Sequence, residues 1–165
     1  MSYKAYKRGL KDEQLFMELT GATPRESGQS DRDHIDCNLD GFTVDVKGLR
    51  RSHKEGYILV EFLNVQGHKG WCNATGTPDK IAFLFPEGFY VVDNHDLYFM
   101  SRDLITTHND SYEVRRESGV KPSKGVYRLI GRTPFRGNPR KDVFTYIKKS
   151  DLLTISYDFY SVENN

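Results

Sequence analysis

The 165-residue chain is 37% hydrophobic and 13% aromatic, which excludes a disordered chain and supplies enough apolar material for the core of one domain. No apolar run is long enough to span a membrane and the N-terminus lacks an apolar signal-peptide centre, so we expect a cytoplasmic protein with no membrane partner. The two cysteines, Cys37 and Cys72, lack the spacing of a zinc site and are expected to be buried thiols in a reducing compartment.

The net charge of +1 conceals a strong division along the chain. Residues 1–114 hold 13 Lys and Arg against 18 Asp and Glu, residues 115–149 hold 11 against 2, and residues 150–165 hold none against 3. A basic block beside an acidic region is typical of a protein that brings a polyanion to an acidic site. The alternative is a solvated basic loop.

The first predicted element is a helix over residues 10–19, LKDEQLFMEL. Leu15, Phe16 and Leu19 form one apolar stripe, and Gly21 is a typical helix stop. A connector rich in Pro, Gly and Ser follows.

Residues 34–48, HIDCNLDGFTVDVKG, predict a hairpin whose loop is Asp40-Gly41. The expected register runs from Leu39 opposite Phe42 back to His34 opposite Lys47. One face then carries Ile35, Cys37, Leu39, Phe42, Val44 and Val46, and the other carries His34, Asp36, Asn38, Thr43, Asp45 and Lys47. The first set predicts a core face.

Asp36 and Asp45 are directly opposite each other in this register, and like charges so placed are destabilising. A divalent cation between them would compensate. The alternative is a solvated face on which Lys47 supplies a nearby counter-charge.

The run YILVEFLNV, residues 57–65, predicts a central strand covered on both faces. Glu61 is its only charge, and a buried carboxylate must be paired, protonated or bound to metal. The alternative is a glutamate near a strand end that reaches solvent.

A second hairpin is predicted from DKIAFLF and GFYVV, joined across Pro86-Glu87-Gly88, followed by a helix over residues 96–105 capped by Asp93 or Asn94. From residue 111 onward, VYRLIG and VFTYI predict strands separated by the loop GRTPFRGNPRKD. This order of elements predicts an α/β or α+β domain with a central mixed sheet flanked by helices.

These residues resemble the PD-(D/E)XK nuclease superfamily, whose signature is a helical Glu, an acid on one strand and (D/E)-x-K on the next. The corresponding residues are Glu13 in the helix, Asp36 in H-I-D-C, and Asp45-Val46-Lys47. The resemblance covers residues 9–104. It departs from the pattern at Ile35, which stands where the superfamily has Pro, and at Asp45, where Glu is more frequent. Glu18 is the other candidate for the helical acid.

The resemblance implies a restriction-endonuclease-like fold and Mg²⁺-dependent cleavage of DNA or, less often, RNA, with Mn²⁺ able to replace Mg²⁺. Residues 1–110 would form the nuclease core and residues 111–165 a basic extension packed on the same domain. Asp36, Asp45 and Glu61 would be the metal ligands and Lys47 would hold the attacking water or neutralise the phosphate. By analogy, such an enzyme would suit a bacteriophage, a mobile element or a restriction or repair system, and a homodimer could cut both strands.

In the nuclease interpretation the basic segment binds phosphates. The predicted nucleic-acid contacts are His34, Arg132, Arg136, Arg140 and Lys141, with Tyr127, Phe135 and Tyr146 as candidate stacking surfaces. His34, His53 and His68 lack the paired His and Asn spacing of an HNH nuclease. Two other classes stay open: a nucleic-acid-binding module that has lost cleavage, and a protein whose acidic face mimics phosphates.

Overall fold

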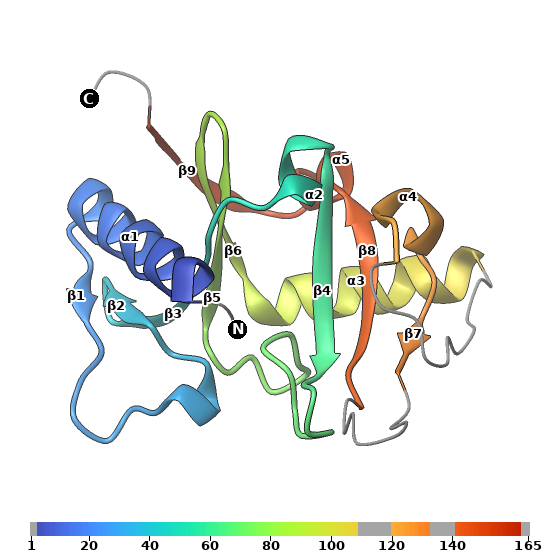
Figure 1. Ribbon diagram of the computed structural model, residues 1–165, viewed down its shortest axis with the longest axis horizontal. Helices are drawn as coiled ribbons and strands as arrows, with labels where there is room; N and C mark the ends of the chain where they lie inside the picture. The colour runs from blue at the N-terminus through green and yellow to red at the C-terminus, as the bar shows by residue number, and fades with distance from the viewer. Residues whose placement is uncertain (1–2, 109–119, 133–140, 163–165) are drawn as a thin grey trace.

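The computed structural model describes residues 3–108, 120–132 and 141–162, apart from a few side chains near the N-terminus and at Asp31 (Figure 1). Its elements in chain order are α1 (Tyr3–Thr20), β1 (Thr23–Pro24), the 3-10 helix η1 (Asp31–Asp33), β2 (Cys37–Leu39), β3 (Phe42–Lys47), α2 (Arg51–Lys54), β4 (Tyr57–Leu63), β5 (Lys80–Phe85), β6 (Gly88–Asp93), α3 (Asn94–His108), α4 (Pro122–Gly125), β7 (Ile130–Gly131), β8 (Val143–Lys148), α5 (Lys149–Leu152) and β9 (Tyr157–Ser161).

The strands form two sheets. The larger has six strands in the order β1-β2-β3-β5-β6-β9, and the smaller has three in the order β4-β8-β7. The pair β3 and β5 is parallel, whereas the other pairs are antiparallel. The predicted mixed sheet flanked by helices is therefore confirmed.

The larger sheet is buried on both faces at β5 and β6. Ala82 and Leu84 point toward α1, where Phe16 is completely buried, and Ile81 and Phe83 point toward the smaller sheet and α3. Figure 1 accordingly places α1 and the smaller sheet on opposite sides of β5 and β6. Burial on both faces explains why the sequence of β5, KIAFLF, is apolar at consecutive positions.

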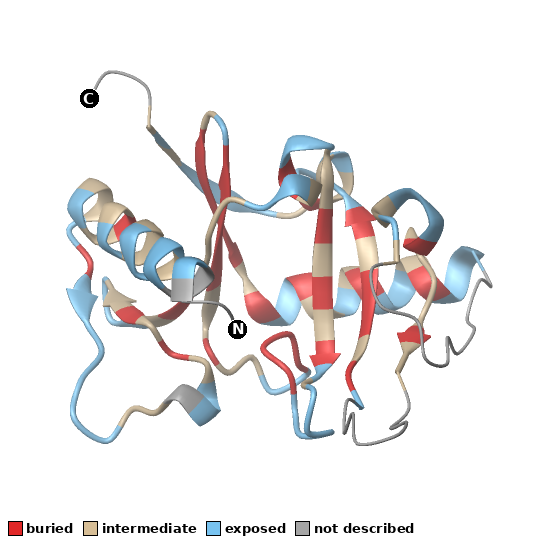
Figure 2. Ribbon diagram, viewed as in Figure 1, coloured by how far each residue is buried: buried red, intermediate tan, exposed pale blue. Residues whose placement is uncertain are grey.

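The strand β4 corrects a prediction. It is an edge strand of the smaller sheet rather than a central strand covered on both faces. Ile58, Val60 and Phe62 are buried in the main core, but Leu59 and Glu61 on the other face are only half-buried. Figure 2 shows this alternation as red and tan residues along β4. Although the sequence of β4 is almost continuously apolar, its residues are buried only at every second position.

The two predicted helices exist and are longer than expected. α1 begins at Tyr3 and ends at Thr20, where the Gly21 amide donates to the Met17 carbonyl at 2.9 Å and Gly21 adopts a φ of 78°. α3 begins at Asn94, and Asp93 caps it by accepting from the Asp96 amide at 3.1 Å.

The first hairpin follows the predicted register only near its loop. Leu39 lies opposite Phe42 and Cys37 opposite Val44, but the ladder ends there. The predicted pairing of Asp36 with Asp45 and of His34 with Lys47 is wrong, because the strand pairing does not extend to these residues. Phe42 is also 48% exposed rather than in the core.

The C-terminal third of the chain contributes strands to both sheets. β8 lies between β4 and β7, and β9, an element that the sequence did not predict, forms the edge of the larger sheet beside β6. Both cysteines are free and buried. Within the described part of the chain, no helix has the length and apolar character needed to cross a membrane.

His53 in α2 makes the stability of the fold depend on pH. Its side chain is 4% exposed, and Nδ1 lies 2.7 Å from the Leu84 carbonyl oxygen, which fixes it as the ring N–H donor. Burial lowers the pKa of His53 to about 4 from 6.5. Between pH 6.5 and pH 4, His53 is therefore protonated in the unfolded chain but not in the folded one. The unfolding free energy falls as the pH drops through this window.

We expect the wild type to lose about 2 kcal/mol more unfolding free energy between pH 7 and pH 5 than a His53→Asn variant loses. The Asn amide can still donate to Leu84 but does not titrate. Urea denaturation of both proteins at the two pH values measures this, and the other titrating groups are common to both. Equal losses would show that His53 does not carry the dependence.

Candidate active site

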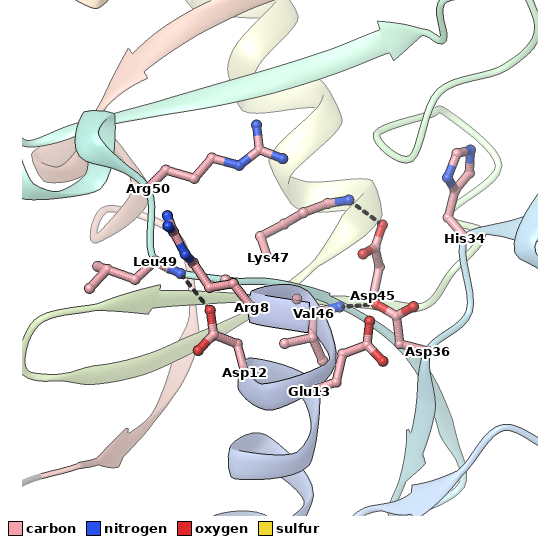
Figure 3. Close-up of a pocket in the computed structure, with 12 residues that line it drawn as sticks. Arg8, Asp12, Glu13, His34, Asp36, Asp45, Val46, Lys47, Leu49 and Arg50 are labelled. Carbon is pink, nitrogen blue, oxygen red and sulfur yellow. Dashed lines mark hydrogen bonds and ion pairs between the residues drawn. The ribbon is translucent and has the colours of Figure 1, made fainter. Parts of the chain in front are cut away.

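A cavity of about 560 Å³ opens between the middle of α1 and the C-terminal half of β3. We call it the acidic cavity; it is lined by Arg8, Gly9, Asp12, Glu13, His34, Asp36, Asp45, Val46, Lys47, Gly48, Leu49 and Arg50. Figure 3 shows Glu13, Asp36 and Asp45 close together, although they come from α1, the residue before β2, and β3. The structure thus brings together five of the residues that the sequence singled out, namely Glu13, His34, Asp36, Asp45 and Lys47.

Asp36 occupies the point where the hairpin ladder ends. Its backbone amide donates to the Val44 carbonyl at 2.9 Å, and its carboxylate accepts from the Val46 amide at 2.8 Å. The side chain therefore takes the place of a backbone acceptor. This bond fixes the Asp36 carboxylate beside β3 in spite of the broken register.

Asp45 and Lys47 form an ion pair at the centre of the cavity. Asp45 is only 3% exposed, and its Oδ2 lies 2.9 Å from Lys47 Nζ. No described donor is aligned to hydrogen-bond this buried oxygen, so the contact is an ion pair without hydrogen-bond geometry. The Lys47 ammonium also lies 4.8 Å from the centre of the Trp71 ring.

α1 contributes through residues on one helical face. Asp12 Oδ2 accepts from the Leu49 amide at 3.2 Å, which ties the helix to the chain leaving β3. A Cβ atom on Gly48 would lie 2.3 Å from this oxygen, so a larger residue there would displace the Asp12 carboxylate. Glu13, one residue after Asp12, lines the cavity, whereas Glu18 is exposed and does not.

The carboxylates of the acidic cavity repel one another, and the nearby positive charge of Lys47 does not fully offset this repulsion. The pKa of Asp36 is raised to about 8, first by burial and then by the Asp45 carboxylate, with a smaller rise from Glu13, while the Val46 amide and Lys47 oppose the rise. A divalent cation would relieve this repulsion and would also satisfy the buried Asp45 oxygen. The residues present therefore fit a hard cation such as Mg²⁺, which takes oxygen ligands.

Glu61 lies near the acidic cavity without lining it. Burial raises its pKa, and the charges of Lys47 and Asp45 are close enough to act on it. It belongs to the half-buried face of β4, in the other sheet. From there it could reach a cation through water, in a supporting position.

Two arginines line the other side of the cavity. Both line the cavity, and in the view of Figure 3 they appear on one side of Lys47 while Asp36 and Asp45 appear on its other side. No described carboxylate forms an ion pair with either arginine within 4.0 Å. A phosphate diester could therefore lie with its negative oxygens toward the arginines and its ester bond toward the acids.

The predicted nucleic-acid contacts are spread over the molecule. His34 lines the acidic cavity, with a φ of 56° and its Nε2 3.3 Å from the Lys69 carbonyl oxygen. Arg132 is half-buried, 3.7 Å from an Asp142 oxygen and stacked over Phe144, which favours a structural role. Lys141 is exposed. Arg136 and Arg140 lie outside the described residues.

The candidate stacking aromatics also lie in different parts of the structure. The Tyr127 hydroxyl donates to Asp151 at 2.6 Å and its ring stacks on His108, so this side chain is used within the fold. Tyr146 lines a different cavity, which it shares with Arg50. Phe135 lies outside the described residues.

A second group of potential metal ligands lies at the start of α3. Within the described residues, Asp93, His95 and Asp96 are the one set of three whose ligand atoms gather closely enough for a single ion, within 4.8 Å of one another. Asp93 already caps α3 and lies 3.7 Å from Lys80, and the other two are exposed. A cation in the acidic cavity would instead rest on Asp36 and Asp45 with water and substrate oxygens, as Mg²⁺ often does.

Sequence reasoning missed Arg8, Asp12, Arg50 and Trp71. Asp12 could have been found, because it precedes Glu13 on a helix whose next turn carries the buried Phe16. Arg50 follows D-V-K-G-L in a charged segment and has no distinguishing pattern. No protein-family model, curated protein or solved structure matches the chain.

Proposed function

We propose that the protein is a metal-dependent endonuclease that hydrolyses phosphodiester bonds in DNA, built on a restriction-endonuclease-like fold. The observation that carries the proposal is the convergence of Asp36, Asp45 and Lys47 with Glu13 on one cavity. A surface hairpin face would leave its carboxylates in water. Here Asp45 is buried, and burial raises the pKa of Asp36.

Each residue has a proposed role. Asp36 and Asp45 hold Mg²⁺ or Mn²⁺, which when bound supplies a nucleophilic water at neutral pH and stabilises charge on the phosphate. Lys47 orients the attacking water or neutralises the developing negative charge. Arg8 and Arg50 bind the phosphate from the opposite side of the cavity.

The second candidate is a nucleic-acid-binding module that does not cleave. The observation in its favour is that, among the described residues, no three potential ligand atoms of the acidic cavity lie within 4.8 Å of one another, whereas those of Asp93, His95 and Asp96 do. This candidate predicts binding without metal dependence. The ion pair of Asp45 with Lys47 would then be structural.

The test is incubation of the wild-type protein with supercoiled and linear duplex DNA, single-stranded DNA and RNA, each in Mg²⁺, Mn²⁺ and EDTA. We expect cutting of DNA in either metal and none in EDTA. Cutting of RNA alone would change the substrate class. Binding of nucleic acid with no cutting in any metal would support the binding module instead.

A further inference from the structure

A second cavity, of about 550 Å³, lies on the half-buried face of the smaller sheet. α2 packs on β4 there, and α4 packs on both β4 and β8. We call it the basic cavity; it is lined by residues that include Arg50, Arg51, Glu55, Leu59, Lys121 and Tyr146. Its volume falls in the range of pockets that hold one small ligand.

The charge of this cavity is positive. The Arg51 guanidinium is neutralised by Glu55, with Nε 2.8 Å from the carboxylate. Arg50 and Lys121 have no ion-pair partner among the described residues. Two cations at the rim of a concave surface are suited to an anion with several oxygens, such as a phosphate.

The floor of the basic cavity is apolar and aromatic. Leu59 and Val120 pack against the buried Phe144 and Ile130, and the Tyr146 ring meets Phe144 edge to face with centroids 5.9 Å apart. No described residue hydrogen-bonds the Tyr146 hydroxyl. An aromatic surface beside unpaired cations matches a nucleotide, whose base stacks and whose phosphate is anionic.

Arg50 joins this cavity to the acidic cavity, because it lines both. The effect of its positive charge on the pKa values of two neighbouring groups supports this placement. Burial raises the pKa of Glu61 and of Tyr146, and the Arg50 guanidinium opposes both rises. Arg50 is thus close to an acid on one side and to the aromatic floor on the other.

We propose that the basic cavity binds an unpaired nucleotide of the DNA strand whose neighbouring phosphate lies in the acidic cavity. This inference rests on the proposed endonuclease function and names its substrate class. A base inside a duplex is stacked and paired and cannot enter such a hollow, whereas an unpaired base can. The enzyme should therefore prefer DNA with a single-stranded flank at the cleavage site over continuous duplex.

The test compares Lys121→Glu with Lys124→Glu. Lys124 lies on α4, which begins directly after Lys121, and is exposed, but it does not line the cavity. The two substitutions change the net charge equally. Fluorescence anisotropy in EDTA measures the affinity for a labelled oligo-dT strand and for a blunt duplex. We expect Lys121→Glu to weaken oligo-dT binding about tenfold more than Lys124→Glu does. The two variants should weaken binding of the blunt duplex equally. Equal effects of the two variants on oligo-dT would overturn the inference.

A cleavage measurement separates this inference from the proposed function. Wild-type protein in Mn²⁺ should cut a duplex with a single-stranded flap at least about tenfold faster than the fully paired duplex, and Lys121→Glu should lose that preference. Equal cutting of both substrates by the wild type would overturn the inference and leave the endonuclease proposal standing. Selective oligo-dT binding without cutting in any metal would support nucleotide binding in the basic cavity and refute the endonuclease proposal.

Discussion

An Asp45→Asn variant is expected to lose metal-dependent DNA cleavage by at least about 10³-fold while keeping its fold. Asparagine has nearly the same shape as aspartate but cannot supply the negative charge that a divalent cation needs. The substitution removes the ion pair with Lys47, but it also removes the repulsion between Asp45 and Asp36. The unfolding free energy in EDTA should therefore change by less than about 2 kcal/mol.

Two measurements check this expectation, a cleavage time course in Mn²⁺ and a thermal melt with and without Mn²⁺. The wild type should melt at a higher temperature in Mn²⁺, and the variant should not, because the cation stabilises only a fold that binds it. Asp40→Asn is the matched control, since Asp40 is an exposed residue of the same hairpin whose φ of 51° asparagine tolerates. If Asp45→Asn cut DNA like this control, Asp45 would not be a metal ligand.

The sequence predicted the local parts of the site better than its surroundings. The hairpin loop at Asp40-Gly41, the helix that carries Glu13, and the D-V-K order on β3 all depend on residues close in sequence. Period-two alternation placed Asp45 and Lys47 on the same face, and they do form a pair. Turn chemistry and periodicity carry this kind of information directly.

Two features around the site could not be predicted in this way. The break in the ladder at Asp36 arises because its side chain, rather than its backbone, accepts from the Val46 amide. The placement of Glu61 in a separate sheet depends on the pairing of β4 with β8, which lies more than 80 residues further along the chain. The Asp36 bond joins residues of one hairpin, but period-two alternation does not indicate where a side chain replaces a backbone acceptor. The pairing of β4 is decided by which surfaces pack together, which no single window of sequence shows.

A Lys47→Met variant is expected to lose cleavage by about 10²-fold to 10⁴-fold while still binding metal. Methionine is unbranched and similar in length, so the packing against Trp71 is largely kept. The variant removes the ammonium that orients water or neutralises the phosphate in the proposed mechanism. It leaves Asp36 and Asp45, the proposed ligands, in place.

Metal binding and cleavage should therefore move in opposite directions in this variant. Without metal, Asp45 becomes a 3% exposed carboxylate that has lost its ion-pair partner, so the variant should melt below the wild type in EDTA. Mn²⁺ no longer competes with the ammonium for the Asp45 oxygen, so the rise in melting temperature on adding Mn²⁺ should exceed that of the wild type. Thermal melts over a Mn²⁺ titration, beside cleavage rates at saturating Mn²⁺, measure both effects. A variant that cut DNA at the wild-type rate would remove Lys47 from the chemistry, and one that gained no stability from Mn²⁺ would show that Lys47 supports the carboxylates instead of competing for them.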